Sequence, residues 1–186
     1  MNSRDKILSG TAAAAVMTGI AFAYTKKKKK ENTTPLKVAE NVDLDRYLGE
    51  WYEIARLPAS FEKHCYATKA IYSKNDDGTI KVENICHEKD VSGPVKSVTG
   101  KAYVPEKGNN AKLKVQFFWP FKGDYWILEL GDNYEYSLVG EPTRKHLWIL
   151  SRTPQIELNA LQLLVEKAKA KGFNTEKLIY TEQGGQ

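Results

Sequence analysis

The side chains most able to do chemistry in this 186-residue sequence are two cysteines and the histidines beside them. His64 precedes Cys65, and His87 follows Cys86. Thiolates and imidazoles are zinc ligands, but this spacing matches no standard zinc site. An even number of cysteines in an exported chain favours a disulfide instead, so we predict the pair Cys65–Cys86. Two unpaired buried thiols are the alternative.

No other motif in the sequence points to catalysis. The third histidine, His146, lies in no metal-binding or triad pattern, and the sequence contains neither a glycine-rich phosphate loop nor Gly-x-Ser-x-Gly. Either cysteine would be a nucleophile only if it were unpaired. We therefore expect no catalytic residue, no metal and no cofactor.

The charge distribution argues against nucleic-acid binding. The chain has a formal net charge of +5, but residues 1–30 hold seven lysines and arginines against one aspartate. The remaining residues therefore carry a net charge of −1. A domain without a basic excess lacks the electrostatic footprint that phosphate backbones require.

The first thirty residues have the composition of a targeting segment. Ile7–Tyr24 is a run of 18 residues without a charge, which suits a secretory signal and is about long enough to span a bilayer. The lysines at 26–30 favour the alternative of an anchor that leaves them in the cytoplasm. We expect an exported protein of the periplasm or cell envelope, with residues 1–30 cleaved or kept as an anchor and residues 31–40 as a flexible tether.

The body of the chain is predicted to be all-β. Short β-rich stretches alternate with turns rich in Gly, Pro, Asn and Asp, and Lys122-Gly123 is taken as one of these turns. Eight consecutive antiparallel strands can close into an up-and-down β-barrel with room for one small ligand. A hairpin that turns at Asn75–Gly78 would bring both cysteines to its far end. The predicted strands are 50–57, 67–74, 79–87, 95–104, 111–118, 124–130, 134–140 and 146–152.

One C-terminal helix is predicted to pack on the outside of the barrel. Thr153 is expected to cap it, Pro154 to lie in its first turn and Gly172 to end it. A short last strand is predicted at 177–181. The apolar stripe that would face the barrel consists of Leu158, Leu161, Val165 and Ala168.

Three sequence blocks together resemble the lipocalin family, in particular its bacterial lipocalin and apolipoprotein D branch. They are "NVDLDRYLGEWYEIARLP" (41–58), "LKVQFFWPFKGDYWIL" (113–128) and "LWILSRTP" (147–154). The resemblance covers residues 41–183 and implies the barrel fold. No cysteine follows the N-terminal apolar run, which departs from lipoprotein members of the family.

The resemblance also implies structural roles for three residues. It implies that Gly49 allows a tight turn into the closed end of the barrel. Trp51 would then plug that end. Arg152 resembles the family arginine that lies across this indole.

Alternation along each strand predicts which side chains face the interior, taking Trp148 and Arg152 as inward. On two strands the choice stays open, because Trp126, Leu128 and Leu138 on the opposite face are also apolar and would suit contact with the helix. The predicted ligand-binding set is Ala70, Tyr72, Val82, Asn84, Ala102, Val115, Phe117, Tyr125, Ile127, Ser137, Val139 and Trp148.

A mainly apolar lining suits a long hydrophobic ligand with a polar head near the mouth. The resemblance implies transport or storage of a fatty acid or lysophospholipid in the envelope by a monomer or weak dimer. The alternatives are a lipid- or polyene-modifying enzyme on the same scaffold and a barrel that binds a partner without ligand. The apolar loop Phe118–Phe121 would either touch a membrane or partner, or fold over the mouth.

Overall fold

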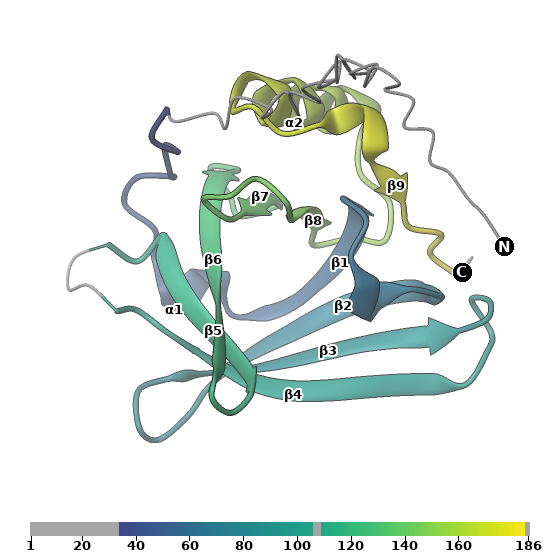
Figure 1. Ribbon diagram of the computed structural model, residues 1–186, viewed down its shortest axis with the longest axis horizontal. Coiled ribbons are helices and arrows are strands. Elements are labelled where there is room, and N and C mark those ends of the chain that lie inside the picture. Colours follow the sequence, from purple (N-terminus) through teal and green to yellow (C-terminus); the bar gives the residue numbers. More distant parts are fainter. Residues whose placement is uncertain (1–33, 106–108, 185–186) are drawn as a thin grey trace, which may run out of the picture. The chain divides into compact units, whose positions relative to one another are not determined.

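The computed structural model describes residues 34–105 and 109–184, which form a barrel of antiparallel strands with a helix beside it (Figure 1). The N-terminal segment and the lysine run lie outside the described residues. The strands are β1 (Gly49–Arg56), β2 (Cys65–Lys74), β3 (Ile80–Glu88), β4 (Val95–Tyr103), β5 (Lys112–Phe118), β6 (Phe121–Leu130), β7 (Tyr136–Gly140), β8 (Leu147–Ser151) and β9 (Ile179–Tyr180). The helices are α1 (Leu44–Tyr47) and α2 (Leu158–Ala170), with short 3-10 turns at Ser60–Glu62 and Thr175–Lys177.

Strands β1 to β8 follow one another around the barrel, and β1 closes it by pairing with both β8 and β2. This confirms the predicted eight-stranded up-and-down barrel. The closing β1–β2 ladder covers only Gly49–Tyr52 against Lys69–Tyr72. Beyond this ladder, β9 pairs with β1, and the Ala67 N–H donates to the Glu182 carbonyl at 2.8 Å. The C-terminal segment thus fills the space where β1 and β2 separate.

The ladder between β4 and β5 is also short. Only Lys101–Tyr103 pair with Lys114–Gln116, whereas β3 and β4 pair along their whole lengths. The first two thirds of β4, from Val95 to Gly100, therefore have no ladder to β5, and the β5–β6 hairpin diverges from β4 beyond the shared pairs (Figure 1).

Two apolar clusters occupy the two faces of the sheet. One fills the barrel interior around Trp51, and the other lies between the barrel and α2. Trp126, Leu128 and Leu138, whose side the sequence left open, belong to the cluster under the helix. The strand alternation of apolar residues is therefore weak where the helix covers the sheet, because both faces are buried there.

Helix α2 begins at Leu158, not near Thr153 as predicted. The Thr153 hydroxyl donates to the Gln155 carbonyl at 2.5 Å and so does not cap a helix. The prediction that Leu158 belongs to the apolar stripe facing the barrel is also wrong, because 64% of this residue is exposed. Leu164 is buried there instead.

The end of α2 agrees with the prediction. Gly172 has a φ of +88°, and the Phe173 N–H donates to the Ala168 carbonyl at 3.1 Å, as in a Schellman motif. Phe173 is buried against the barrel, so this turn anchors the helix to the sheet.

Two further expectations differ from the structure. Lys122 and Gly123 lie within β6, and the hairpin turns instead at Trp119-Pro120, whose peptide bond is cis. The expected tether includes residues that pack on the barrel: Leu36 is buried in the cluster under α2, and the Ala39 N–H donates to the Ile127 carbonyl at 2.9 Å.

Within the part of the chain that the structure describes, no helix has the length and apolar character needed to cross a bilayer.

Candidate ligand-binding site

The closed end of the barrel is built around Trp51, which is fully buried. Its indole N–H donates to the Tyr47 carbonyl at 2.8 Å. The Arg152 guanidinium lies 3.9 Å from the centre of the indole ring and donates to the carbonyls of Glu50 and Arg46, each at 2.8 Å. Gly49 has a φ of +96°, and a Cβ there would lie 3.2 Å from an Arg152 nitrogen. The plug therefore depends on a glycine at the turn and on an arginine that ties three chain segments together.

The predicted inward side chains lie on the interior face. Ten of the twelve belong to the interior apolar cluster, Ser137 is fully buried and bonds to Tyr47, and Asn84 lies opposite Ala70 and Val98 in the strand ladders. The ten are Ala70, Tyr72, Val82, Ala102, Val115, Phe117, Tyr125, Ile127, Val139 and Trp148.

Exposure of this face changes along the barrel axis. On β5, Leu113 is buried near the closed end, whereas Val115 and Phe117 are half-buried toward the mouth. Strand β4 repeats the trend, with Ala102 buried and Val98 half-buried. The closed half is thus filled by its own side chains, while the mouth half presents apolar surface that a ligand can cover.

A chain of hydroxyl groups crosses the interior between these halves. The Tyr125 hydroxyl lies 2.9 Å from the hydroxyls of both Tyr47 and Tyr72, and the Tyr47 hydroxyl lies 3.2 Å from the Ser137 Oγ. Burial raises the pKa of Tyr47 to about 12 and raises the pKa values of Tyr72 and Tyr125 well above 10. The phenols therefore stay neutral at physiological pH and form a polar but uncharged floor to the mouth half.

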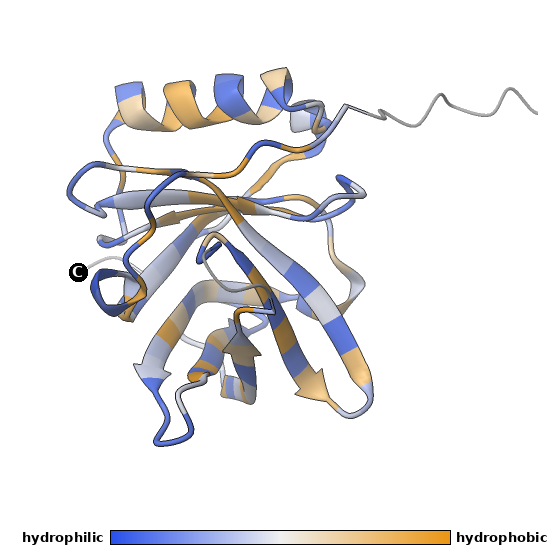
Figure 2. Ribbon diagram, turned by 90° about the vertical axis from the view of Figure 1, so that its left-hand side faces the viewer, coloured by the Kyte–Doolittle hydropathy of each residue, from blue (hydrophilic) through white to orange (hydrophobic). Residues whose placement is uncertain are grey.

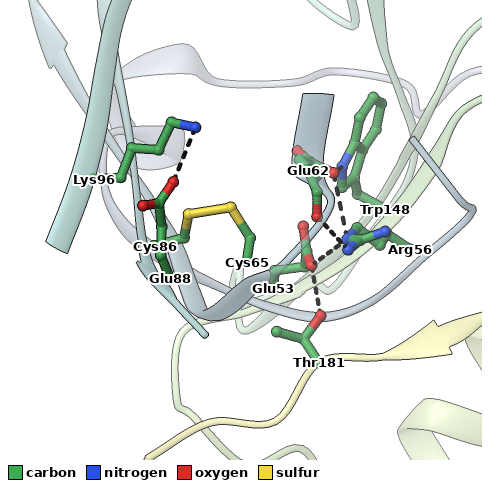
Figure 3. The surroundings of a disulfide bond; sticks show 9 residues. All are labelled: Glu53, Arg56, Glu62, Cys65, Cys86, Glu88, Lys96, Trp148 and Thr181. Carbon is green, nitrogen blue, oxygen red and sulfur yellow. Dashed lines mark hydrogen bonds and ion pairs between the residues drawn. A yellow bond between two sulfur atoms is a disulfide. The ribbon is translucent and has the colours of Figure 1, made fainter. Parts of the chain in front are cut away.

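A buried ionic cluster lies beside the mouth and joins Glu53, Arg56 and Glu62 (Figure 3). The Arg56 Nε lies 3.1 Å from a Glu53 carboxylate oxygen and 3.4 Å from a Glu62 carboxylate oxygen. The Trp148 indole N–H donates to Glu62 at 3.2 Å, and the Thr181 hydroxyl donates to Glu53 at 2.5 Å. The cluster thus connects β1, the Ser60–Glu62 turn, the cavity wall and the C-terminal segment.

Both carboxylates of this cluster are buried and are protonated more readily than usual, although they share the Arg56 guanidinium, which favours their charged forms. Burial, followed by repulsion from Glu62, raises the pKa of Glu53 to about 8. Burial likewise raises the pKa of Glu62. At neutral pH we expect the Glu53–Glu62 pair to hold one proton and the whole cluster to be close to neutral.

The loop at 58–64 is held against the mouth ends of β1 and β8 by two kinds of contact besides the ion pairs. The ring of Phe61 lies 5.9 Å from the ring of His146, which stacks on Trp148 at the same separation. The Glu62 carbonyl accepts from Arg56 at 2.7 Å. One side of the mouth is therefore closed by an aromatic stack.

The two cysteines form a disulfide, as predicted, between β2 and β3 at the mouth (Figure 3). Their Cα atoms are 5.3 Å apart and 21 residues separate them in sequence. No group of three or more His, Cys, Asp or Glu side chains within 34–105 and 109–184 is arranged to hold a metal ion.

A hollow of about 250 Å³ lies at the other end of the barrel, between α1 and the ends of β2 to β4. Asp43 and Asp45 line it together with Lys74, whose ammonium pairs with Asp45 at 3.2 Å. Three charged side chains thus line this hollow beside apolar ones such as Leu48 and Ile80, so it is a less uniformly apolar site for a long apolar ligand than the inward faces of β4 and β5.

The sequence prediction missed the ionic cluster and the role of Tyr47. Glu53 follows Trp51 by two residues on one strand, so alternation alone places both on one face. Glutamates are rarely buried, which hid this signal. Arg56 and Glu62 lie close to Glu53 in sequence, but nothing local links Glu53 to Thr181, which is 128 residues away.

A closed antiparallel barrel of eight strands with an apolar, partly open interior defines a class of small ligand-binding barrels. A sequence profile described as a Lipocalin-like domain matches residues 42–183. The chain therefore belongs to the lipocalin family. Family membership and the lining together support the binding of a small hydrophobic ligand.

Named relatives and solved structures agree with this assignment. The outer membrane lipoprotein Blc of Vibrio cholerae is 41% identical over 80% of this chain and 86% of its own length. Temperature-induced lipocalin-1 of Arabidopsis thaliana is also 41% identical, over 84% of this chain and 85% of its own, and bovine apolipoprotein D is 34% identical over 78% and 79%. The structure of insecticyanin from the tobacco hornworm superposes with a TM-score of 0.64 at 22% identity, over 81% of this chain and 85% of that one, and shows the shared fold.

Proposed function

We propose that this protein binds and carries a single-chain lipid, a fatty acid or a lysophospholipid, in the mouth half of its barrel. The observation that carries the proposal is the change in exposure along the inward faces of β4 and β5, where apolar residues go from buried near the closed end (Ala102, Leu113) to half-buried toward the mouth (Val98, Val115, Phe117). Burial contributes roughly 0.8 kcal/mol per methylene, so ten methylenes give a gross gain of about 8 kcal/mol before the ordering cost.

The ionic cluster favours one of the two lipid classes. Glu62 accepts a hydrogen bond from the inward-facing Trp148, and its guanidinium partner, Arg56, is shared with Glu53. Because this guanidinium is already shared by two carboxylates, the cluster offers no free cation to the carboxylate of a fatty acid, whereas a zwitterionic lysophospholipid head group needs none. We therefore expect tighter binding of the lysophospholipid.

The envelope is the proposed place of action. This rests on the outer membrane lipoproteins among the relatives and on the export-like composition of residues 1–30. The proposed role is passive carriage or storage, since the hydroxyl groups of the floor stay neutral and the ionic cluster is internally paired.

The test is native mass spectrometry of gently purified protein, together with displacement of a fluorescent fatty acid. Val98→Trp fills the mouth half from the inside, and Ser97→Trp adds the same bulk on the outward face of the same strand. We expect micromolar or tighter binding in wild type and in Ser97→Trp, and a loss of at least roughly tenfold in Val98→Trp. No retained lipid and no micromolar binding in the wild type would refute the proposal.

A further inference from the structure

The β5–β6 hairpin ends in an exposed aromatic tip, which we define as Phe118, Trp119 and Phe121. Their exposed fractions are 69%, 87% and 77%. Figure 2 shows this hairpin standing away from the neighbouring strands, with hydrophobic residues on both sides of its turn. The tip therefore does not fold over the mouth, which was one of the two expectations for this loop.

Side chains of this kind are rarely left in water without a partner, because each aromatic ring carries some 150–250 Å² of apolar surface. A stable protein–protein interface needs about 800 Å² from each side. A two-residue turn with three aromatic rings is too small and too pointed for that. Its shape and composition suit a wedge that enters the boundary between lipid head groups and acyl chains, where Trp and Phe are favoured.

The charges around the tip agree with a lipid surface. Strands β4 and β5 and the first half of β6 contain five lysines and one aspartate. Lys96, Lys101 and Lys114 pair with Glu88, Asp77 and Asp124, and Lys112 lies toward the closed end, so Lys122 is the lysine that adjoins the tip. Lys122 follows the tip directly, and its ammonium lies 5.2 Å from the ring of Tyr103. A basic group beside an apolar wedge is attracted to anionic lipid head groups.

The tip also borders the most open side of the barrel. Phe117, next to the tip in sequence, points inward and is half-buried, and it lies against Gly100 of β4. On this side β4 from Val95 to Gly100 has no ladder to β5. An apolar path thus runs from the tip to the interior through Phe117 and Val115.

From these observations we propose that the aromatic tip docks the protein on a lipid bilayer and places the separation between β4 and β5 at the membrane surface. Docking is independent of the carrier function proposed above. The use of this separation for the passage of an acyl chain rests on that function.

The test uses the full chain and vesicles of phosphatidylethanolamine and phosphatidylglycerol that contain a brominated lipid, which quenches nearby indoles. Of the four tryptophans, Trp119 is the most exposed and belongs to the tip, whereas Trp51 is buried. We expect strong quenching of the wild type and its loss in Trp119→Phe, which keeps the apolar tip but removes the reporter. Equal quenching of these two proteins, or none in either, would overturn the proposal.

A second comparison measures the contribution of the neighbouring rings to docking. Phe118→Ser with Phe121→Ser should lower quenching of Trp119 and raise the lipid concentration at half-effect by roughly tenfold or more. Leu158→Ser with Tyr180→Ser removes two side chains that are 64% and 59% exposed elsewhere, and should behave as wild type. Circular dichroism of each variant establishes that it is folded.

Two outcomes of this comparison would count against docking through the tip. One is equal vesicle binding by both double variants. The other is a wild type that sediments as a dimer and shows no vesicle-dependent quenching, while the Phe118→Ser, Phe121→Ser variant alone sediments as a monomer. That result would make the tip a contact between two copies of the chain. Displacement of a fluorescent fatty acid in vesicle-free solution separates this result from a failure of the carrier function.

Discussion

Replacing Glu53 with glutamine is expected to remove most of the pH dependence of stability between pH 5 and 8. In the native protein, burial and the neighbouring Glu62 raise the pKa of Glu53 from 4.5 to about 8. A raised pKa means that the folded protein holds a proton that the unfolded chain releases. The associated stability is fully present below pH 4.5 and is lost as the pH rises through about 8.

The size of the effect follows from the two pKa values. For an isolated group whose pKa rises from 4.5 in the unfolded chain to about 8 in the folded protein, the free energy of unfolding falls by about 3 kcal/mol between pH 5 and pH 8. This follows from roughly 1.4 kcal/mol per pKa unit. Glutamine keeps the volume and the acceptor for the Thr181 hydroxyl but has no proton to lose. With Glu53 neutralised, Arg56 pairs with Glu62 alone, which lowers the pKa of Glu62 and removes the rest of the slope.

The assay is urea unfolding at several pH values from 5 to 8, with the disulfide kept oxidised. Glu50→Gln is the matched control on the same strand, because Lys69 lowers the pKa of Glu50 and that stability is lost only toward acid pH. Wild type and the Glu50→Gln variant should therefore lose stability in parallel as the pH rises. A Glu53→Gln variant that keeps the wild-type slope would refute the account of the ionic cluster.

Three other substitutions test the packing of the barrel. Leu164→Ala should cost about 2–5 kcal/mol in urea unfolding because Leu164 is buried under the helix, whereas Leu158→Ala should stay within about 0.5 kcal/mol. Arg152→Met should cost about 2–4 kcal/mol through the lost ring contact and hydrogen bonds, and near-ultraviolet circular dichroism should report a changed indole environment. Cys65→Ser with Cys86→Ser should lower the free energy of unfolding by about 3 kcal/mol for a sequence separation of 21. A reductant should lower the thermal midpoint of the wild type to that of the variant and leave the midpoint of the variant unchanged.

The barrel was predictable because its signals are local and repeated. Turn residues separate the strands, and alternation fixes which side chains share a face once Trp148 is placed inward. The disulfide was predictable for the same reason, since both cysteines lie at the ends of one hairpin. Alternation gave no decision for Trp126 and Leu138, because the helix buries the outer face of their strands as well.

The errors arise where a local signal competes with tertiary contacts. Thr153 and Pro154 have the composition of a helix start, but the Thr153 hydroxyl bonds to Gln155 and the helix begins later. Lys122-Gly123 resembles a turn, yet Gly123 pairs with Val115 inside the hairpin. The ionic cluster at the mouth was missed because glutamates are rarely buried and because its hydrogen-bond partners Trp148 and Thr181 come from distant parts of the chain.

The C-terminal strand has a consequence for how the molecule is made. Gln183 donates to the carbonyls of Glu53 and Thr68 across 130 and 115 residues, and β9 joins β1 over a similar span. Contacts of such long range form late in folding. A nascent chain that still lacks residues 179–183 can pair β1 with β2 and with β8, but it leaves the space beyond the short β1–β2 ladder uncovered. The wall of the barrel is therefore complete only after the last residues of the domain have been synthesised.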